Sequence, residues 1–513
     1  MPLRSQSPKR TGSGPSLPPS SIGSLSGEEP FLRSCASAKA RSAAAFNKVF
    51  LFSDIRLIYA AFIRSQGYYM PSPPQNFSQP GSSLAGKSVK RPVLNVARLA
   101  AIGILNGVMT EQKQLSEMIQ TEDFRNLPSE ERARAQRLAT HTLRHVGRAD
   151  RALRSHLSKL PAVEVLNILR LGVVEIVALD APAHAVVNDL VSICAANGQT
   201  RGFKGLINAV LRKAVADISG KWDKSPVQMM PKWLRNPLKE AYGNGPIMAM
   251  ETAHMRGAPV DLSVVSNAEK WAKLLGGIIL PNGSVRLAEM GQITKLDGFA
   301  TGQWWVQDAA ATWPGAWLAV KEGETVLDVC AAPGGKTMQL ANAGGQVTAL
   351  DISKYRMERV TENLVRTDLH AETIIANILE WDDVRKFDAV LLDAPCSATG
   401  TIRRHPDLPF AKDGTGIFEL IDLQSKMLNA ASQRVKPGGR LVFCTCSLIP
   451  DEGEVQAENF LLSHKDFSVD TSVPQGMEVE WATEEGGYRL RPDYWAEHGG
   501  MDGFYIIRFN RAG

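Results

Sequence analysis

The chain has 513 residues, and because domains average about 150 residues we expect about three of them. Its composition, 44% apolar and 22% charged, is typical of a globular protein and excludes a wholly disordered or fibrous one. No uninterrupted apolar stretch approaches the roughly 20 residues that a membrane-spanning helix needs, so we expect no membrane partner.

The formal net charge of +5 is unevenly distributed along the chain. Residues 1–69 hold nine basic and three acidic side chains, and residues 86–216 hold nineteen basic and eleven acidic ones, a net charge of +8. Residues 217–513 hold 30 basic and 39 acidic side chains, a net charge of −9. Because concentrated positive charge attracts anions, we expect residues 86–216 to bind an anionic partner such as a nucleic acid.

The first segment, residues 1–90, is rich in Ser, Pro, Gly and Arg and shows no sustained periodicity, which predicts a disordered basic tail. A basic, acid-poor N-terminus is also typical of an organelle transit peptide. The alternative that we favour is an extension upstream of a second start at Met70. Six scattered cysteines without zinc-ligand spacing predict no disulfide framework and no metal site. Reduced thiols favour a cytoplasmic location, with organelle targeting as the minor alternative.

Helical periodicity dominates residues 91–217, where apolar side chains recur every three or four positions in "LNVARLAAIGILNGVM", "EVLNILRLGVVEIVAL" and "FKGLINAVLRKAV". This pattern predicts an all-α bundle. Residues 218–300 mix helical stretches with the strand-like runs "PVDLSVV" and "GSVRLAE", which predicts a small α+β connector.

Strands alternate with helices in residues 301–513. The strand-like runs are "TVLDVC", "QVTALD", "ETIIAN", "DAVLLDAP" and "GRLVFCTC", and helices are expected at residues 354–366 and 418–434. This alternation predicts an α/β, doubly wound parallel sheet. Such sheets bind ligands beyond the carboxyl ends of their strands, and the polar motifs of this region lie at these ends.

A glycine-containing turn follows the first strand in "LDVCAAPGGKT". It matches neither GxGxxG nor the P-loop, which disfavours phosphate binding, but it allows a ligand to approach the start of the next helix. Asp351 ends the second strand, where an acid can bind ribose hydroxyls, and Asn377 ends the third. The pattern predicts an adenosine pocket without a pyrophosphate site, which fits S-adenosylmethionine. The simpler alternative is that Asp328 and Asp351 only cap loops.

Two cysteines, Cys396 in "DAPCS" and Cys446 in "CTCS", are expected at adjacent strand ends. Methylation at carbon 5 of a pyrimidine requires a thiolate to add at carbon 6, which makes carbon 5 nucleophilic. Asp393 is placed to bind the edge of the base, and Lys336 to favour a thiolate. Cys444 is expected to be a packing residue. The following segment "TIRRHPDLP" suggests that Arg403 and Arg404 bind phosphates and that Asp407 orients them or the base.

These motifs, with "WWVQDAAA" ahead of them, together resemble the RsmB/Sun (Fmu) family of RNA cytosine-5 methyltransferases, which act on 16S ribosomal RNA, over about residues 94–510. The resemblance implies a Rossmann-like methyltransferase domain, with Cys446 as nucleophile, Cys396 assisting product release and Asp393 at the catalytic centre. S-adenosylmethionine would then be bound by Asp351, Asn377, Asp393 and the loop of Cys330, Ala331, Ala332, Pro333, Gly334, Gly335 and Lys336. Asn377 departs from the Asp usual in the family.

The helical region resembles the NusB antitermination fold through "ILRLGVVEIV", "AHAVVNDLV" and "FKGLINAVLR". That fold binds RNA and proteins, so RNA, above all ribosomal RNA, is the expected partner. We expect the protein to be a monomer. A cluster suited to phosphate contacts comprises Arg132, Arg134, Arg137, Arg144, Arg148, Arg151 and Arg154.

Other functions remain open at this stage. One is a non-catalytic NusB-like RNA-binding or antitermination factor, and another is a cytosine-5 methyltransferase that acts on tRNA. Amino-group methylation is disfavoured because it would call for an Asn/Asp-Pro-Pro-aromatic motif where "DAPC" stands, and it would leave Cys446 without a role.

Overall fold

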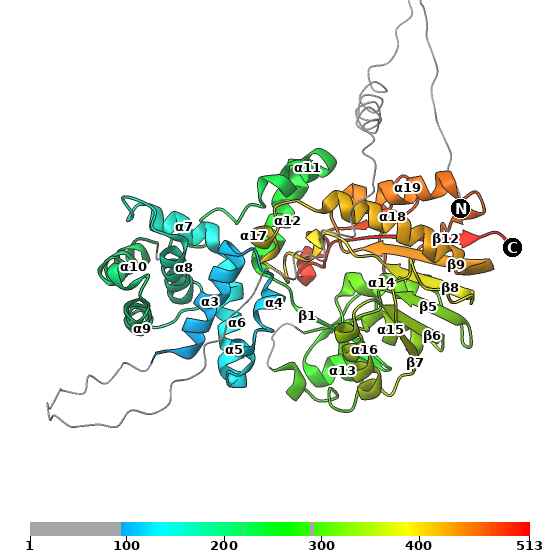
Figure 1. Ribbon diagram of the computed structural model, residues 1–513, viewed down its shortest axis with the longest axis horizontal. Helices are drawn as coiled ribbons and strands as arrows, with labels where there is room; N and C mark the ends of the chain where they lie inside the picture. Colours follow the sequence, from blue (N-terminus) through cyan, green and yellow to red (C-terminus); the bar gives the residue numbers. More distant parts are fainter. Residues whose placement is uncertain (1–93, 219, 288–291) are drawn as a thin grey trace, which may run out of the picture. The chain divides into compact units, whose positions relative to one another are not determined.

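The computed structural model describes residues 94–218, 220–287 and 292–513 (Figure 1). The predicted disordered tail, residues 1–90, lies outside the described residues. Within the described part of the chain, no helix is both long and apolar enough to cross a membrane.

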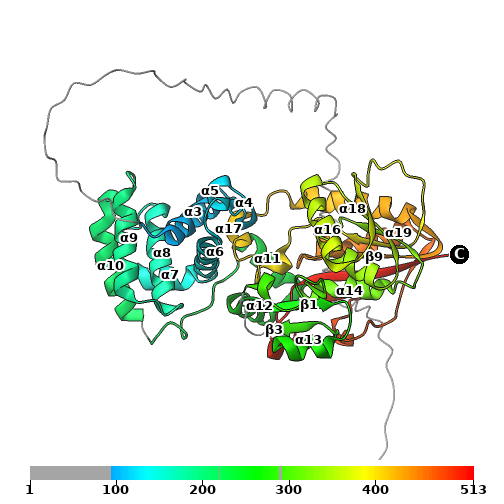
Figure 2. The same ribbon diagram turned by 90° about the horizontal axis from the view of Figure 1, so that it is seen from below.

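Helices alone form the first part of the described chain, as the periodicity predicted (Figure 2). Its three long apolar helices, α3, α8 and α10, pack their buried faces into one core. Asn95 caps the start of α3 by accepting a hydrogen bond from the Arg98 N–H. The helices are α3 (Val96–Thr110), α4 (Leu115–Met118), α5 (Glu122–Arg125), α6 (Ser129–Arg144), α7 (Val146–Arg154), α8 (Val163–Val177), α9 (Ala183–Ala196) and α10 (Lys204–Ile218).

Two helices and a small antiparallel sheet come next. The helices are α11 (Lys232–Tyr242) and α12 (Asn244–Arg256), and α13 (Ala268–Leu275) packs on the sheet. The strand order is β2-β3-β1-β4, with bounds β1 (Val260–Val264), β2 (Ile278–Ile279), β3 (Val285–Leu287) and β4 (Trp304–Val306). Strand β4 comes after residue 300, so this sheet draws on both sides of the boundary expected there.

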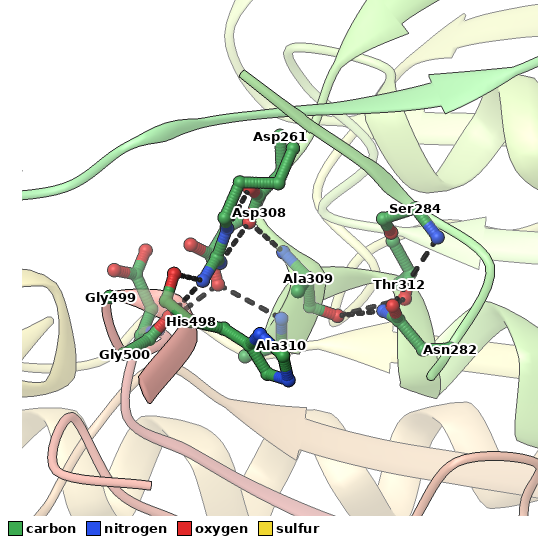
Figure 3. Close-up of polar contacts among 12 residues, drawn as sticks. Asp261, Asn282, Ser284, Asp308, Ala309, Ala310, Thr312, His498, Gly499 and Gly500 are labelled. Carbon is green, nitrogen blue, oxygen red and sulfur yellow. Dashed lines mark hydrogen bonds and ion pairs between the residues drawn. The ribbon is translucent and has the colours of Figure 1, made fainter. Parts of the chain in front are cut away.

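A buried ion pair joins the small sheet to its surroundings. Arg286 on β3 binds both carboxylate oxygens of Asp261 on β1, at 2.6 and 2.7 Å. The Arg286 guanidinium also donates to the backbone carbonyls of His498 and Gly500. Asp261 in turn accepts the Ala309 N–H at the start of α14 (Ala309–Leu318) (Figure 3). These bonds fix the small sheet against the first helix that covers the large one.

The large sheet has eight strands in the order β10-β12-β9-β8-β5-β6-β7, with β11 beside β12. Strands β9, β8, β5, β6 and β7 run parallel, and β12 lies antiparallel to β9. The bounds are β5 (Thr325–Val329), β6 (Gln346–Asp351), β7 (Ala371–Ile375), β8 (Phe387–Asp393), β9 (Val435–Thr445), β10 (Phe467–Val469), β11 (Tyr488–Leu490) and β12 (Phe504–Arg511).

Helices cover both faces of the large sheet because successive strand residues point to opposite sides. On one face lie α14, α15 (Gly335–Asn342) and α16 (Lys354–Thr367). On the other lie α18 (Ile417–Gln433) and α19 (Glu454–Ser463), and the short α17 (Leu408–Ala411) contacts α3. The parallel strands therefore open their carboxyl ends to a common edge.

Candidate active site

The loop between β5 and α15 turns sharply at the carboxyl edge of the sheet. Cys330 and Gly334 have positive φ angles of 63° and 102°, and the Ala332–Pro333 peptide is cis. A side chain on Gly334 would be strained at this φ, and its Cβ would lie 3.3 Å from Val360. Gly334 therefore lets α15 begin close to the edge, with its first N–H groups near the strand ends.

Asp351 organises the neighbouring strand end. Its side chain is 2% exposed, accepts the Ala332 N–H at 3.2 Å and the Ser353 N–H at 2.9 Å, and lies 3.5 Å from the Arg356 guanidinium. Each carboxylate oxygen has two acceptor positions, so these contacts leave capacity for a ligand hydroxyl. The Asp351 carboxylate therefore keeps acceptor capacity at this edge of the sheet.

A pocket of about 400 Å³ lies along this edge. Small-molecule sites typically enclose about 300–1,000 Å³, so the pocket has room for a nucleoside-sized cofactor. Predicted residues at or just beyond the ends of five strands line it together: Cys330, Asp351, Asn377, Asp393, Cys396 and Cys446.

Lys336 and Asp393 form an ion pair at the inner side of the site. The Lys336 Nζ lies 2.8 Å from the Asp393 Oδ2 and 5.2 Å from the centre of the Phe504 ring. Burial opposes the charge of Lys336, but Asp393 and the thiols of Cys444 and Cys446 outweigh burial and raise its pKa. Lys336 is therefore held as a cation beside Asp393 at the inner side of the site.

Cys396 and Cys446 meet at the end of the pocket, with their Sγ atoms 3.4 Å apart. The hydrogen bond to Cys446, together with burial, raises the pKa of Cys396 well above its ordinary value. Either sulfur atom can donate in this contact. The arrangement therefore places two thiols within direct reach of each other at the end of the pocket.

Comparison with known proteins gives two adjoining matches. The family model of the 16S rRNA methyltransferase RsmB/F matches residues 315–510, and that of the NusB family matches residues 95–216. "Ribosomal RNA small subunit methyltransferase B" of Pasteurella multocida is 34% identical, over 67% of this chain and 80% of the relative. The protein of the same name from Xanthomonas campestris pv. campestris is 36% identical, over 77% of this chain and 93% of the relative.

The chain belongs to the RsmB/F methyltransferase family. It is therefore an RNA methyltransferase that uses S-adenosylmethionine, and the resemblance found in its motifs is confirmed. The fold agrees: the crystal structure of PH0851 superposes with a TM-score of 0.63 at 22% identity, covering 82% of this chain and 100% of the other.

Not every residue predicted for the RsmB/F cofactor site lines the pocket. Residues 331–336 form the turn beside it, and Ala332 contributes its N–H to Asp351. Asn377 lies two residues beyond β7, and its Oδ1 accepts the Leu379 N–H at 3.1 Å. The sequence patterns missed the lining residues Arg356, Leu423 and Met427, which belong to helices without a motif.

Cys444 and Asp328 lie inside the core rather than in the pocket. The Cys444 Sγ approaches the Asp393 Oδ1 at 3.5 Å, and its side chain is fully buried in an apolar cluster. Asp328 accepts a hydrogen bond from the Thr337 hydroxyl at 2.6 Å, while its Oδ1 has no hydrogen-bond partner. Burial raises the pKa of Asp328 to about 7.

The phosphate-binding hypothesis for Arg403 and Arg404 is wrong. Arg403 is fully buried, with its Nε 2.7 Å from Asp502 and its Nη2 bonded to Asp308. The Arg404 guanidinium also binds both carboxylates, through an Nε contact of 2.8 Å to Asp502 and a second contact to Asp308. The two arginines therefore neutralise a buried acidic pair, and Asp308 also caps α14 through the Ala310 N–H (Figure 3).

Asp407 does not orient a substrate either. Its Oδ2 accepts the Leu115 N–H of α4 at 2.9 Å, and the residue is 2% exposed. Arg144 of α6 donates to the Arg403 carbonyl at 2.9 Å, and Phe410 packs against the helical core. The segment after Cys396 is thus the attachment point of the helical region.

The predicted cluster of seven arginines does not act as one surface. Arg144 and Arg148 are largely buried, and the half-buried Arg132 donates to the Arg125 carbonyl at 2.8 Å. The other four stand exposed on α6 and α7: Arg134, Arg137, Arg151 and Arg154. Only the exposed group remains available for phosphate contacts. In the described part of the chain, no cluster of three or more His, Cys, Asp or Glu side chains is arranged to hold a metal ion.

Proposed function

We propose that this protein transfers a methyl group from S-adenosylmethionine to carbon 5 of a cytosine in 16S ribosomal RNA. The observation that carries the proposal is the Cys396–Cys446 pair, with a 3.4 Å Sγ–Sγ distance, at the end of a nucleoside-sized pocket. A methyltransferase acting on a nitrogen or oxygen atom needs no thiolate, whereas activation of a pyrimidine carbon 5 does.

Cys446 is the nucleophile in this mechanism. Its thiolate adds to carbon 6 of the cytosine, and the electron pair of the 5,6 double bond becomes available to form the new bond between carbon 5 and the methyl group. Transfer of the carbon 5 proton to a water molecule then restores the double bond, and the electron pair of the carbon 6–sulfur bond leaves with Cys446 as its thiolate. Lys336, facing the sulfur atoms, stabilises the thiolate before addition and after release.

Cys396 and Asp393 assist these steps. Cys396 lies 3.4 Å from Cys446, close enough to serve the release of the product. Asp393 keeps its orientation through Lys336, and a carboxylate there accepts a hydrogen bond from the cytosine amino group.

S-adenosylmethionine supplies the activated methyl group, and the donor set of the pocket fits it. Asp351 offers carboxylate oxygens to the ribose, and Asn377 offers an amide to the adenine. The turn of residues 330–336 brings backbone groups and the start of α15 to the same edge, with Cys330 and Asp393 inside the pocket. No phosphate-binding motif is required.

Tritiated S-adenosylmethionine tests the proposed function. We expect label in 16S ribosomal RNA and, after digestion to nucleosides, in 5-methylcytosine. Label in tRNA instead would assign the enzyme to tRNA, and label in N4-methylcytosine would refute the cysteine mechanism. Absence of transfer to any RNA would favour a non-catalytic RNA-binding factor.

We further propose that the helical region, residues 91–217, holds the ribosomal RNA while residues 301–513 carry out the chemistry, with residues 218–300 connecting them. The excess of basic side chains in residues 86–216 and the exposed arginines of α6 and α7 support this division. We propose a monomer that works in the cytoplasm. Light scattering of the purified protein tests the first point, and fluorescence microscopy of a tagged chain the second.

A further inference from the structure

A fully buried carboxylate lies behind the two cysteines and is not among the residues used above. Glu452 is 0% exposed and belongs to the short helix η4 (Pro450–Glu452) between β9 and α19. Its Oε1 accepts the Ser397 N–H at 2.8 Å and the Gln424 side-chain amide at 3.0 Å. Its Oε2 accepts the hydroxyls of Ser397 at 2.5 Å and Ser447 at 2.6 Å.

These contacts join the two cysteine-bearing segments. Ser397 directly follows Cys396, and Ser447 directly follows Cys446. The backbone carbonyl of Glu452 also accepts the hydroxyl of Thr445 at 2.9 Å. Gln424 of α18 reaches the same segment from behind, because it also donates to the Pro395 carbonyl at 2.9 Å. One side chain thus contacts residues immediately beyond both sulfur atoms.

Stability alone does not explain a carboxylate in this position. Burying an ionised group is costly unless an opposite charge or several donors compensate for it. Among the described residues, Glu452 forms no ion pair with a Lys, Arg or His. Its four donors are neutral hydroxyl and amide groups. What such a group does provide is geometry, because its four hydrogen bonds fix the positions of the segments that they join.

We propose that Glu452 is a positioning residue that holds the Cys396 segment in register with the Cys446 segment. This inference rests on the proposed function, because it makes Glu452 responsible for the distance between the Cys396 and Cys446 sulfur atoms, on which product release depends. Cys446 follows directly after β9, which ends at Thr445 and pairs there with β12, so strand pairing also holds Cys446 and we expect addition to the base to survive loss of the Glu452 side chain. Cys396 lies in a loop beyond β8, and its place depends on Ser397 and Pro395.

The negative charge of Glu452 also acts on the neighbouring Cys396 thiol. It adds to the hydrogen bond between Cys396 and Cys446 and to burial in raising the pKa of Cys396. Geometry and charge are separated by Glu452→Gln. The amide oxygen of the glutamine can keep the Ser397 and Gln424 donors, and its NH₂ group can donate to the two hydroxyls, which rotate to accept.

The test compares Glu452→Ala, Glu452→Gln and wild type, with Asp451→Asn as the matched control. Asp451 is the adjacent acid, and its side chain is exposed. For each protein, turnover on 16S ribosomal RNA, adduct with ordinary RNA and adduct trapped on 5-fluorocytosine-containing RNA are measured. S-adenosylmethionine binding and thermal unfolding report general damage to the fold. If Glu452→Ala does not fold, Glu452→Asp replaces it, because this variant withdraws the carboxylate by one methylene.

We expect Glu452→Ala to lose at least about tenfold in turnover while keeping trapping on 5-fluorocytosine and accumulating adduct with ordinary RNA. Glu452→Gln is expected to recover turnover to within about threefold of wild type and Asp451→Asn to match it. Normal turnover in Glu452→Ala, equal loss of turnover and trapping, or no recovery by Glu452→Gln would overturn the positioning role. Wild type that forms no trapped adduct would overturn the proposed function itself.

Discussion

Arg403 provides the clearest contrast between a structural and an RNA-binding arginine. The guanidinium is fully buried between Asp308 and Asp502 and also donates to the Gly499 carbonyl at 3.1 Å. Arg403→Met keeps much of the side-chain volume but leaves two buried carboxylates with Arg404 as their remaining cation. Breaking a buried ion pair costs about 3–5 kcal/mol. Because Arg404 stays, we expect the free energy of unfolding to fall by about 3 kcal/mol, the lower end of this range.

Urea unfolding followed by circular dichroism measures this loss, and filter binding at several salt concentrations measures RNA contacts. We expect Arg403→Met to leave the slope of log K against log[salt] unchanged. The matched control is Arg137→Met, at an exposed arginine of α6, which is expected to change stability by no more than about 0.5 kcal/mol. A stability within about 0.5 kcal/mol of wild type, together with a slope reduced by about 1, would show that Arg403 binds a phosphate.

Three further outcomes follow from the site and the helical surface. Burial raises the pKa of Asp328 to about 7, so its ionisation opposes folding, and the free energy of unfolding is expected to fall by up to about 4 kcal/mol as the pH rises from about 4 to about 7. Urea unfolding of Asp328→Asn should no longer show this pH dependence, and an unchanged pH slope would contradict the assignment. Asp351→Ala is expected to weaken S-adenosylmethionine binding by about 10- to 150-fold in calorimetry through the loss of a charged hydrogen bond, and unaltered affinity would remove Asp351 from the cofactor site. Replacing the four exposed arginines, Arg134, Arg137, Arg151 and Arg154, by Gln is expected to lower the salt slope of RNA binding by about 0.7 per lost phosphate contact, whereas an unchanged slope would place the RNA elsewhere.

The parallel strands could be predicted from sequence because burial on both faces makes them nearly continuous apolar runs. Strands β5, β6, β8 and β9 lie within or next to the runs predicted for them, and α16 and α18 begin and end within one residue of expectation. Strand β12 escaped detection because it has no following helix and runs antiparallel to β9. Strands β2 and β4 of the small sheet are too short to show a pattern of their own, and they can be identified only from the strands with which they pair.

The pocket was predictable where a residue stands at a strand end, as Asp351 and Asp393 do. Arg403 was misassigned because its partners, Asp308 and Asp502, are 95 and 99 residues away in the chain, and a local pattern of adjacent arginines resembles a phosphate-binding loop. No sequence pattern singled out Glu452, because its role depends on Ser397, 55 residues earlier. Long-range pairing of polar side chains is the information that local periodicity lacks.

Identification of the cysteine that bonds to RNA tests the proposed mechanism most directly. Wild type, Cys446→Ala and Cys396→Ala are incubated with S-adenosylmethionine and 5-fluorocytosine-containing 16S ribosomal RNA, and the cross-linked peptide is identified by mass spectrometry. We expect the adduct on Cys446 in wild type and in Cys396→Ala, and none in Cys446→Ala. An adduct on Cys396 in the Cys446→Ala protein would contradict the assignment of the nucleophile.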